Sequence, residues 1–182
     1  IGIPRVLNMY EDFPFWFTFF NQLGCEVVLS DYTTKDQYNK AIDTIPSDTA
    51  CYPAKAVHGH IRDLAQAQVD LIWYPCIQHG PKEFSRDNNY HCPMVISYPE
   101  LIRNNMQDVM GKTPFYAPFL PLADKKSLVP ALVKALKELP FSKSEISSAV
   151  DAAWAEQEKC KADYREMTKK TVSRLVAEQV PT

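Results

Sequence analysis

The first 31 residues, IGIPRVLNMYEDFPFWFTFFNQLGCEVVLSD, decide the fold of this chain. Residues 1–8 predict a first strand, residues 10–24 an aromatic-rich helix, and residues 25–31 a second strand. The apolar run of the second strand is continuous, which is typical of a strand buried on both faces of a sheet. In a parallel sheet, such a strand–helix–strand unit is nearly always right-handed.

The helix at residues 10–24 carries its own boundary signals. Glu11 or Asp12 is placed to cap its start, Pro14 suits its first turn, and Gly24 ends it. Its aromatic residues surround it on every side. We therefore expect neighbouring elements to bury this helix.

Helix and strand patterns continue to alternate toward residue 140. We expect helices at residues 33–45, 53–68, 99–107 and 127–139, with Pro130 in the first turn of the last one, and strands at 69–74, 93–97 and 114–120. This alternation predicts an α/β fold with an open, mostly parallel, doubly wound sheet of the Rossmann or flavodoxin-like kind.

The composition changes after residue 141. Residues 142–179 predict one long, highly charged helix, in which Trp154 is a packing residue. We expect an α/β domain over residues 1–140 and a helical segment over residues 141–182, which packs on that domain or on a missing one. The chain starts inside a strand-like run with no Met, so we expect it to be a piece of a longer polypeptide.

Bulk properties exclude several function classes. The 182 residues are 46% hydrophobic, and a formal net charge of −2 gives no general reason to bind nucleic acid or an anionic membrane. No apolar run approaches the roughly 20 residues of a spanning helix. Five cysteines are an odd number, which argues against a secreted disulfide scaffold and favours a cytoplasmic protein with reduced or metal-bound thiols.

Several catalytic and nucleotide-binding motifs are absent from the sequence. There is no G-x-x-x-x-G-K-S/T loop, no G-x-G-x-x-G after the first strand, no G-x-S-x-G elbow and no H-E-x-x-H pair. With only 5 glycines in the chain, we expect this fragment to bind no nucleotide by itself.

Three of the cysteines lie at junctions between loops and regular elements. Cys51 precedes a helix, Cys76 closes a strand, and Cys92 follows a long loop, in the pattern C-x24-C-x15-C with a proline within two positions of each. By contrast, we expect Cys25 to fill core volume and Cys160 to be exposed and incidental.

Thiolates favour zinc or an iron–sulfur cluster over hard cations. For zinc, the three cysteines with His58, His79 or His91 would form a closed structural site. For a 4Fe–4S cluster, three cysteines would leave one iron open. These alternatives stay open on the residues alone.

Two histidines follow Cys51 on the predicted helix. His58 and His60 are two positions apart, so they point to roughly opposite sides and cannot chelate one metal together. We expect one of them to face the sheet and the other to face solvent.

Four ordered motifs carry a resemblance to a known family. IGIPRVLNMYEDFPFWFTFFNQLG, CYPAKAVHGHI, WYPC and NYHCPMVISYPELIRNN resemble a domain of the large CoA-enzyme activases, which are related to activators of (R)-2-hydroxyglutaryl-CoA dehydratase. The resemblance covers about residues 1–120. More distantly, the chain is similar to the 2-hydroxyacyl-CoA dehydratase subunits, in which three cysteines hold a 4Fe–4S cluster.

The resemblance implies both ligands and partners. It makes Cys51, Cys76 and Cys92 the cluster ligands. Lys55 and His58 lie a turn along the helix after Cys51, so we expect that they tune the cluster or donate hydrogen bonds to its sulfurs. The resemblance also implies an actin/Hsp70-type ATPase part elsewhere in the longer polypeptide and an acyl-CoA dehydratase or reductase as a partner, with a homodimer as a further option.

The resulting hypothesis is a cytoplasmic iron–sulfur electron-transfer domain of anaerobic metabolism, whose cluster is lost on aerobic purification. The alternatives are a non-catalytic domain that docks the ATPase part through the aromatic helix, or a structural zinc site. The cluster hypothesis requires the thiols to lie close together. Because Cys76 ends a predicted strand and Cys92 precedes one, either residues 77–91 would have to double back or the strand after Cys92 would have to start later than expected.

Overall fold

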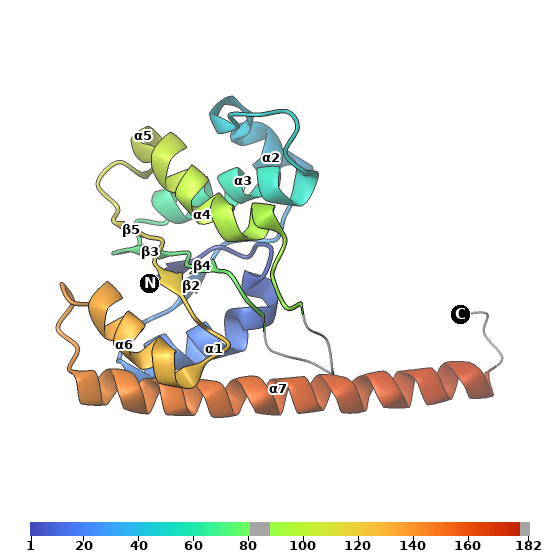
Figure 1. Ribbon diagram of the computed structural model, residues 1–182. Coiled ribbons are helices and arrows are strands. Elements are labelled where there is room, and N and C mark those ends of the chain that lie inside the picture. Colours follow the sequence, from blue (N-terminus) through green and yellow to red (C-terminus); the bar gives the residue numbers. More distant parts are fainter. Residues whose placement is uncertain (81–87, 179–182) are drawn as a thin grey trace.

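The computed structural model describes residues 1–80 and 88–178. Parallel strands form the middle layer, and helices cover both faces (Figure 1). The strands are β1 (Gly2–Ile3), β2 (Val28–Leu29), β3 (Ile72–Trp73), β4 (Cys76–Ile77), β5 (Phe115–Tyr116) and β6 (Phe119–Leu120). One sheet has the order β2-β1-β3-β5, and β4 pairs with β6. The predicted fold class, an open parallel α/β sheet wound on both faces, is confirmed.

Strands β3 and β4 follow each other along one stretch of chain, and β5 and β6 along another. These two stretches pair in the same register throughout. Ile72 pairs with Phe115, and Cys76 with Phe119, at the same sequence offset. Pro75 lies between β3 and β4 and has no N–H to donate, and the stretch between β5 and β6 likewise contains a proline. The two strands predicted here are therefore present, but each is interrupted at a proline.

The helices form two layers around the strands. They are α1 (Met9–Gln22), α2 (Lys35–Lys40), α3 (Tyr52–Gln66), α4 (Pro93–Asn105), α5 (Gln107–Met110), α6 (Lys125–Ala135) and α7 (Lys143–Ala177), with a short 3-10 helix η1 (Ile42–Thr44). In Figure 1, α2 to α5 lie on one side of the sheet, while α1 and α6 lie on the other with α7 across them. Among the described residues, no helix combines the length and apolar character needed to cross a membrane.

The prediction of a strand at residues 93–97 is wrong. That stretch is the first part of α4, which begins at Pro93 rather than at the predicted Pro99. A short apolar run does not distinguish a strand from a buried helix, and here Tyr98 and Ile102, one turn apart, are buried on one helix face. Pro93 occupies the first turn, where its missing N–H costs nothing.

Two other prolines lie deeper in helices than predicted. α1 starts at Met9 after Asn8, so Pro14 is inside the helix, and Glu11 and Asp12 are first-turn residues rather than caps. α6 starts after Asp124, so Pro130 is likewise internal. By contrast, Gly24 directly follows the end of α1 with a φ of +77°, as its predicted role as a helix terminator requires.

The aromatic helix α1 is buried, as predicted. Phe15, Trp16, Phe19 and Phe20 are all buried, and the ring centroids of Trp16 and Trp73 lie 5.2 Å apart across the contact with the sheet. On its other side, Phe15 meets Trp154 of α7 edge-on at 6.2 Å. α1 therefore lies between the sheet and α7, and Trp154 is the packing residue that the sequence predicted.

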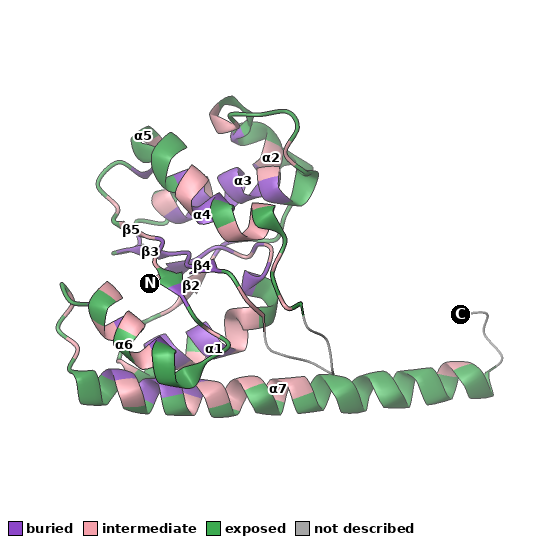
Figure 2. Ribbon diagram, in the orientation of Figure 1, coloured by how far each residue is buried: buried purple, intermediate pink, exposed green. Residues whose placement is uncertain are grey.

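The long helix α7 is buried only along its first part. Ser142 caps it in a reciprocal capping box with Glu145, and Ile146, Val150 and Ala153 are buried against the domain. The rest is mostly exposed and projects beyond the body (Figure 2). The division into domains at residue 140 stays a prediction.

Candidate functional site

Cys51 and Cys92 occupy equivalent positions in the fold. Each is the N-cap residue of a helix, α3 or α4, with a proline in the following turn, and neither thiol makes a cap hydrogen bond. Both are exposed. Each sulfur therefore stands at the end of a helix where backbone N–H groups favour negative charge.

Cys76 differs because it is buried. It lies on β4 beside α4. Burial raises the pKa of its thiol to about 11, with the Glu100 carboxylate adding to the rise, while a hydrogen bond to the Glu100 backbone and the charge of Arg103 oppose it. In the absence of a ligand, Cys76 is thus a neutral thiol packed against α4.

The chain doubles back between Cys76 and Cys92, which is one of the two arrangements that the cluster hypothesis allowed. His79 and Tyr90 form an antiparallel bridge. The Gly80 N–H donates to the Asn89 carbonyl at 2.9 Å, and the His91 N–H donates to the Gln78 carbonyl at 3.0 Å. Because Cys92 then starts a helix and not a strand, it is not carried to the opposite edge of the sheet. Residues 81–87 of this loop lie outside the described residues.

Three buried polar atoms near these thiols have no hydrogen-bond partner among the described residues. They are His58 Nε2, the Tyr74 hydroxyl and the Tyr98 hydroxyl. The rings of His58 and Tyr98 meet edge-on with centroids 5.7 Å apart. Since buried polar atoms in native proteins are nearly always paired, this cluster calls for a ligand, a water or a rearrangement.

Electrostatic coupling connects these tyrosines to the cysteines. Burial raises the pKa of Tyr98 to about 12, and Cys51 adds to the rise. Burial also raises the pKa of Tyr74, to which Cys76 and Tyr98 contribute further. His58 and Tyr98 are in ring contact, and the pKa of each tyrosine is raised further by the charge of a cysteine, Cys76 for Tyr74 and Cys51 for Tyr98. We call His58, Tyr74, Cys76 and Tyr98 the buried polar cluster; Cys51 is exposed and is not part of it.

The expectation that one of the two histidines faces solvent is wrong, because both are fully buried. His58 Nδ1 lies 2.8 Å from Thr44 Oγ1, and the Thr44 hydroxyl is 2.7 Å from the Ala41 carbonyl. Because that carbonyl can only accept, the Thr44 proton goes to it, and Thr44 Oγ1 accepts from His58 Nδ1–H. Burial lowers the pKa of His58 to about 4, so its Nε2 carries a free lone pair at neutral pH.

His60 points the other way, but α2 and the end of β2 cover it. Its Nδ1 and Nε2 each lie 2.8 Å from a hydroxyl, those of Ser30 and Thr33. Burial, with Arg5 adding, lowers the pKa of His60 to about 4. This histidine has both nitrogens partnered and is therefore a structural link between α3 and β2.

The remaining predicted residues have simpler surroundings. Lys55 Nζ donates to the Asp48 carbonyl at 3.4 Å on the surface before α3, and its role toward a cofactor stays a prediction. Cys25 is partly buried against the core, as expected. Cys160 is half-buried rather than exposed.

The thiols do not form a ready-made metal site. In residues 1–80 and 88–178, no three Cys, His, Asp or Glu side chains lie close enough together to hold a metal ion. This covers Cys51, Cys76 and Cys92, and also the zinc sets that add His58, His79 or His91. The assignment of these residues as ligands stays a prediction, and binding through three of them requires the starts of α3 and α4 to approach Cys76.

Sequence reasoning missed Tyr74 and Tyr98. A signal existed for Tyr74, which stands at the carboxyl end of a predicted strand, the edge where α/β proteins form their sites. Tyr98 had no such signal, because the strand expected at residues 93–97 hid the helix that places it.

The fold and these residues define a parallel α/β domain with thiols at the starts of two adjacent helices. A family model described as "CoA enzyme activase uncharacterised domain (DUF2229)" matches residues 1–181, and the chain belongs to that family. The match extends beyond the resemblance seen over residues 1–120 and includes α7. No curated protein and no solved structure matches the chain.

Proposed function

We propose that this CoA-enzyme-activase domain binds an iron–sulfur cluster of the 4Fe–4S type and transfers electrons through it, with Cys51, Cys76 and Cys92 as ligands. The observation that carries the proposal is the shared placement of Cys51 and Cys92. Both thiols are exposed and make no cap hydrogen bond, and both stand at the starts of helices in the same layer. The positive ends of the two helix dipoles would stabilise a cluster whose thiolates carry negative charge.

The unpartnered atoms of the buried polar cluster support a ligand at this place. The Tyr74 and Tyr98 hydroxyls are donors that sulfide or thiolate sulfur would satisfy. The sequence predicts that His58 donates a hydrogen bond to the cluster, but the structure gives it a free acceptor nitrogen instead. Since its Nδ1–H is held by Thr44, its free Nε2 can accept a proton or bind a metal.

The free His58 nitrogen favours a second candidate, a structural zinc site. Three thiolates and one imidazole nitrogen are a common closed tetrahedral set for zinc. This site would make the protein colourless and its folding sensitive to chelators. Metal analysis separates the two candidates.

Because the ligands are not assembled among the described residues, the proposal includes a movement. The thiol of Cys76 must lose its proton and become accessible to the metal, which its burial opposes. Metal binding would then supply the free energy that draws the starts of α3 and α4 together.

The test is anaerobic reconstitution with iron and sulfide of the wild type, Cys51→Ala, Cys92→Ala and the control Cys160→Ala. Cys160 is a half-buried thiol on α7 and has no part in the proposed set. We expect the wild type and Cys160→Ala to bind equal amounts of iron and sulfide, with the colour of a cluster. The two other variants should bind much less. Equal loading of all four proteins would refute the assignment.

The proposed partners follow from the family. The ATPase part of the longer polypeptide would supply nucleotide chemistry, and an acyl-CoA dehydratase or reductase would accept the electrons, in the cytoplasm. Docking through the aromatic helix is a weaker alternative, because α1 is covered by the sheet and α7 and leaves only Tyr10 and Phe17 as exposed aromatics. Size measurement with and without the remaining polypeptide tests a homodimer.

A further inference from the structure

A cavity of about 340 Å³ lies beside the sheet, and its lining includes Ile77, His79 and His91 but none of the three proposed cysteine ligands. Its walls come from the first turns of α1, the segments that follow β4 and β6, and the middle of α7. This volume falls within the range of small-molecule sites, roughly 300–1,000 Å³.

The cavity occupies the edge of the sheet where α/β domains bind ligands. From β1 the chain passes through α1 on one face to β2, and then through α3 on the other face to β3, which lies on the far side of β1 (Figure 1). The strand order therefore reverses between β1 and β3. The cavity lies outside the carboxyl ends of these strands, which is the expected location of a ligand site.

One wall of the cavity carries carboxylates. Asp12 Oδ2 accepts from Asn8 Nδ2 at 3.0 Å, and Glu11 lies beside it on the first turn of α1. Across the cavity, Lys161 Nζ is only 3.0 Å from Glu158 Oε1, so its charge is already balanced. The lining residues that the structure describes include three carboxyl groups, the paired Lys161 and the imidazoles of His79 and His91, and the carboxyl groups outnumber the lysine.

Phe15 of α1 and Trp154 of α7 form an aromatic part of the cavity wall. Their rings meet edge-on. Gln157 of α7 accepts from the Phe15 N–H at 3.1 Å and donates to the Glu11 carbonyl at 2.8 Å. These two hydrogen bonds fix the carboxylate-bearing turn and the aromatic wall relative to each other, so the cavity is preorganised.

We propose that this cavity binds a small organic cation, with an ammonium group against the carboxylates of Asp12 and Glu11 and an apolar body against Phe15 and Trp154. Aromatic faces also attract cations, which adds to the selectivity. A phosphate or carboxylate ligand would meet three carboxyl groups and no unpaired cation among the lining residues that the structure describes. A metal ion is not favoured either, because no group of three ligating side chains occurs in residues 1–80 and 88–178.

Burial also prepares Asp12 for this role. It raises the pKa of Asp12 to about 6, and Glu11 adds to the rise while Asn8 and Lys161 oppose it. At neutral pH, Asp12 is an ionised and partly buried carboxylate. A cation would relieve the cost of keeping it charged.

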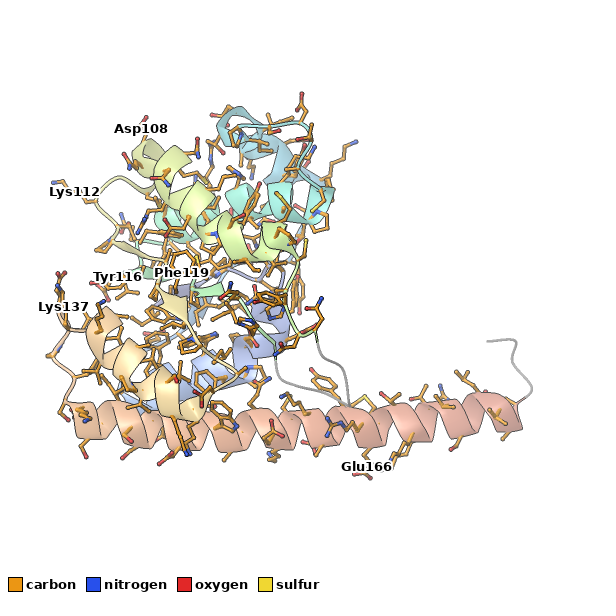
Figure 3. All side chains as sticks on the ribbon, in the orientation of Figure 1. Asp108, Lys112, Tyr116, Phe119, Lys137 and Glu166 are labelled. Carbon is orange, nitrogen blue, oxygen red and sulfur yellow. The ribbon has the colours of Figure 1, made fainter. Side chains whose placement is uncertain are left out.

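The proposal is tested by calorimetric titration at neutral pH with 2-phenylethylamine, its neutral analogue 2-phenylethanol and its anionic analogue 3-phenylpropanoate. The proteins are the wild type, Asp12→Asn, Glu11→Gln and the control Glu166→Gln. Glu166 lies on the part of α7 that projects beyond the body, and its side chain points into solvent (Figure 3). Glu11 is exposed at the rim, so its substitution tests the charge with little risk to folding.

We expect saturable binding of the amine, weaker binding of the alcohol and none of the anion. Asp12→Asn should weaken amine binding about tenfold or more, and Glu11→Gln several-fold, because a charge-assisted hydrogen bond is lost. Glu166→Gln should bind like the wild type. The proposal is overturned if the anion binds as well as the amine, if both lining variants bind the amine like the wild type, or if no saturation occurs below about 10 mM. None of these results bears on the cysteine ligands, since Cys51, Cys76 and Cys92 do not line the cavity.

Discussion

Gln157 of α7 replaces a helix hydrogen bond within α1, where it bridges the N–H of Phe15 and the carbonyl of Glu11. In a regular helix these two backbone groups would bond to each other. Pro14 lies between them and disturbs this turn. The side-chain amide therefore repairs a proline-containing turn from a helix more than 130 residues away along the chain.

Replacing Gln157 with Leu should destabilise the domain by about 1–2 kcal/mol, because the partly buried Phe15 N–H and the exposed Glu11 carbonyl lose their partner. Gln157→Glu keeps an acceptor for the Phe15 N–H but places a carboxylate oxygen against the Glu11 carbonyl, beside the carboxyl groups of the cavity, so it should destabilise at least as much. Urea unfolding of both variants measures the difference. Equal stabilities for Gln157→Leu and the wild type would show that the bridge contributes nothing.

Thr44 sets the tautomer of His58 by accepting from its Nδ1–H. Thr44→Val should therefore lower the free energy of unfolding by about 1–2 kcal/mol, since it leaves the buried Nδ1–H of His58 without a partner, while the Ala41 carbonyl keeps the Thr44 backbone N–H. Thr44→Ser keeps the hydroxyl and serves as the control. ¹⁵N NMR of the histidine side chains should show an Nδ1–H tautomer for His58 in the wild type. An Nε2–H tautomer would contradict the free lone pair on which both metal-site candidates draw.

Gly59 is required by the close approach of α2 to α3. A Cβ at this position would lie 2.6 Å from the Gln37 carbonyl oxygen, so the backbone of α2 would have to shift. Gly59→Ala should thus destabilise the protein by about 1–3 kcal/mol, although Gly→Ala inside a helix normally stabilises it. Thermal unfolding measures whether the clash with Gln37 outweighs the higher helix propensity of alanine. A variant at least as stable as the wild type would show that α2 can shift at little cost.

Acid should destabilise the protein through His58 and His60. Each has a pKa of about 4 in the folded protein and about 6.5 when unfolded, so the unfolded chain binds more protons between these values. Stability is then fully present above pH 6.5 and is lost as the pH falls toward 4. Asp12 acts in the opposite direction between pH 3.8 and 6, because its folded pKa is raised. Two histidines outweigh one aspartate, so the net effect of these three groups is destabilisation by acid.

His60→Gln removes one of the two titrating histidines. The dependence of unfolding free energy on pH, measured by urea unfolding between pH 4.5 and 7, should become shallower in this variant. Asp12→Asn should make it steeper by removing the opposing group. A slope that neither substitution changes would mean that these groups do not titrate as their burial indicates.

The sequence predicted the elements whose signals are local. The strand–helix–strand unit of residues 1–31 and the end of its helix at Gly24 follow from apolar patterning and backbone conformation, and both were confirmed. What it did not predict depends on distant parts of the chain. Pro14 lies inside a helix that Gln157 repairs. His60 is buried because α2 packs closely over Gly59.

In the candidate site, too, local features were predictable from the sequence and features that depend on distant contacts were not. The positions of Cys51 at a helix start and Cys76 at a strand end were readable from the sequence, because prolines and apolar runs mark those junctions. Cys92 was placed before a strand, whereas it begins a helix, because a run of five apolar residues looks the same in a strand and in a buried helix. The unpartnered hydroxyls of Tyr74 and Tyr98 emerge only when α3, α4 and the sheet are assembled.

The central claim, that Cys51 and Cys92 hold the same metal centre, is tested most directly by anaerobic alkylation of the thiols. Protein loaded with iron and sulfide is compared with metal-free protein, and mass spectrometry gives the extent of modification at each cysteine. Both residues are exposed without metal, so both should react readily in the metal-free protein and be protected together in the loaded one, while Cys25 and Cys160 should react alike in both. If Cys51 and Cys92 are alkylated equally fast with and without iron, they are not its ligands.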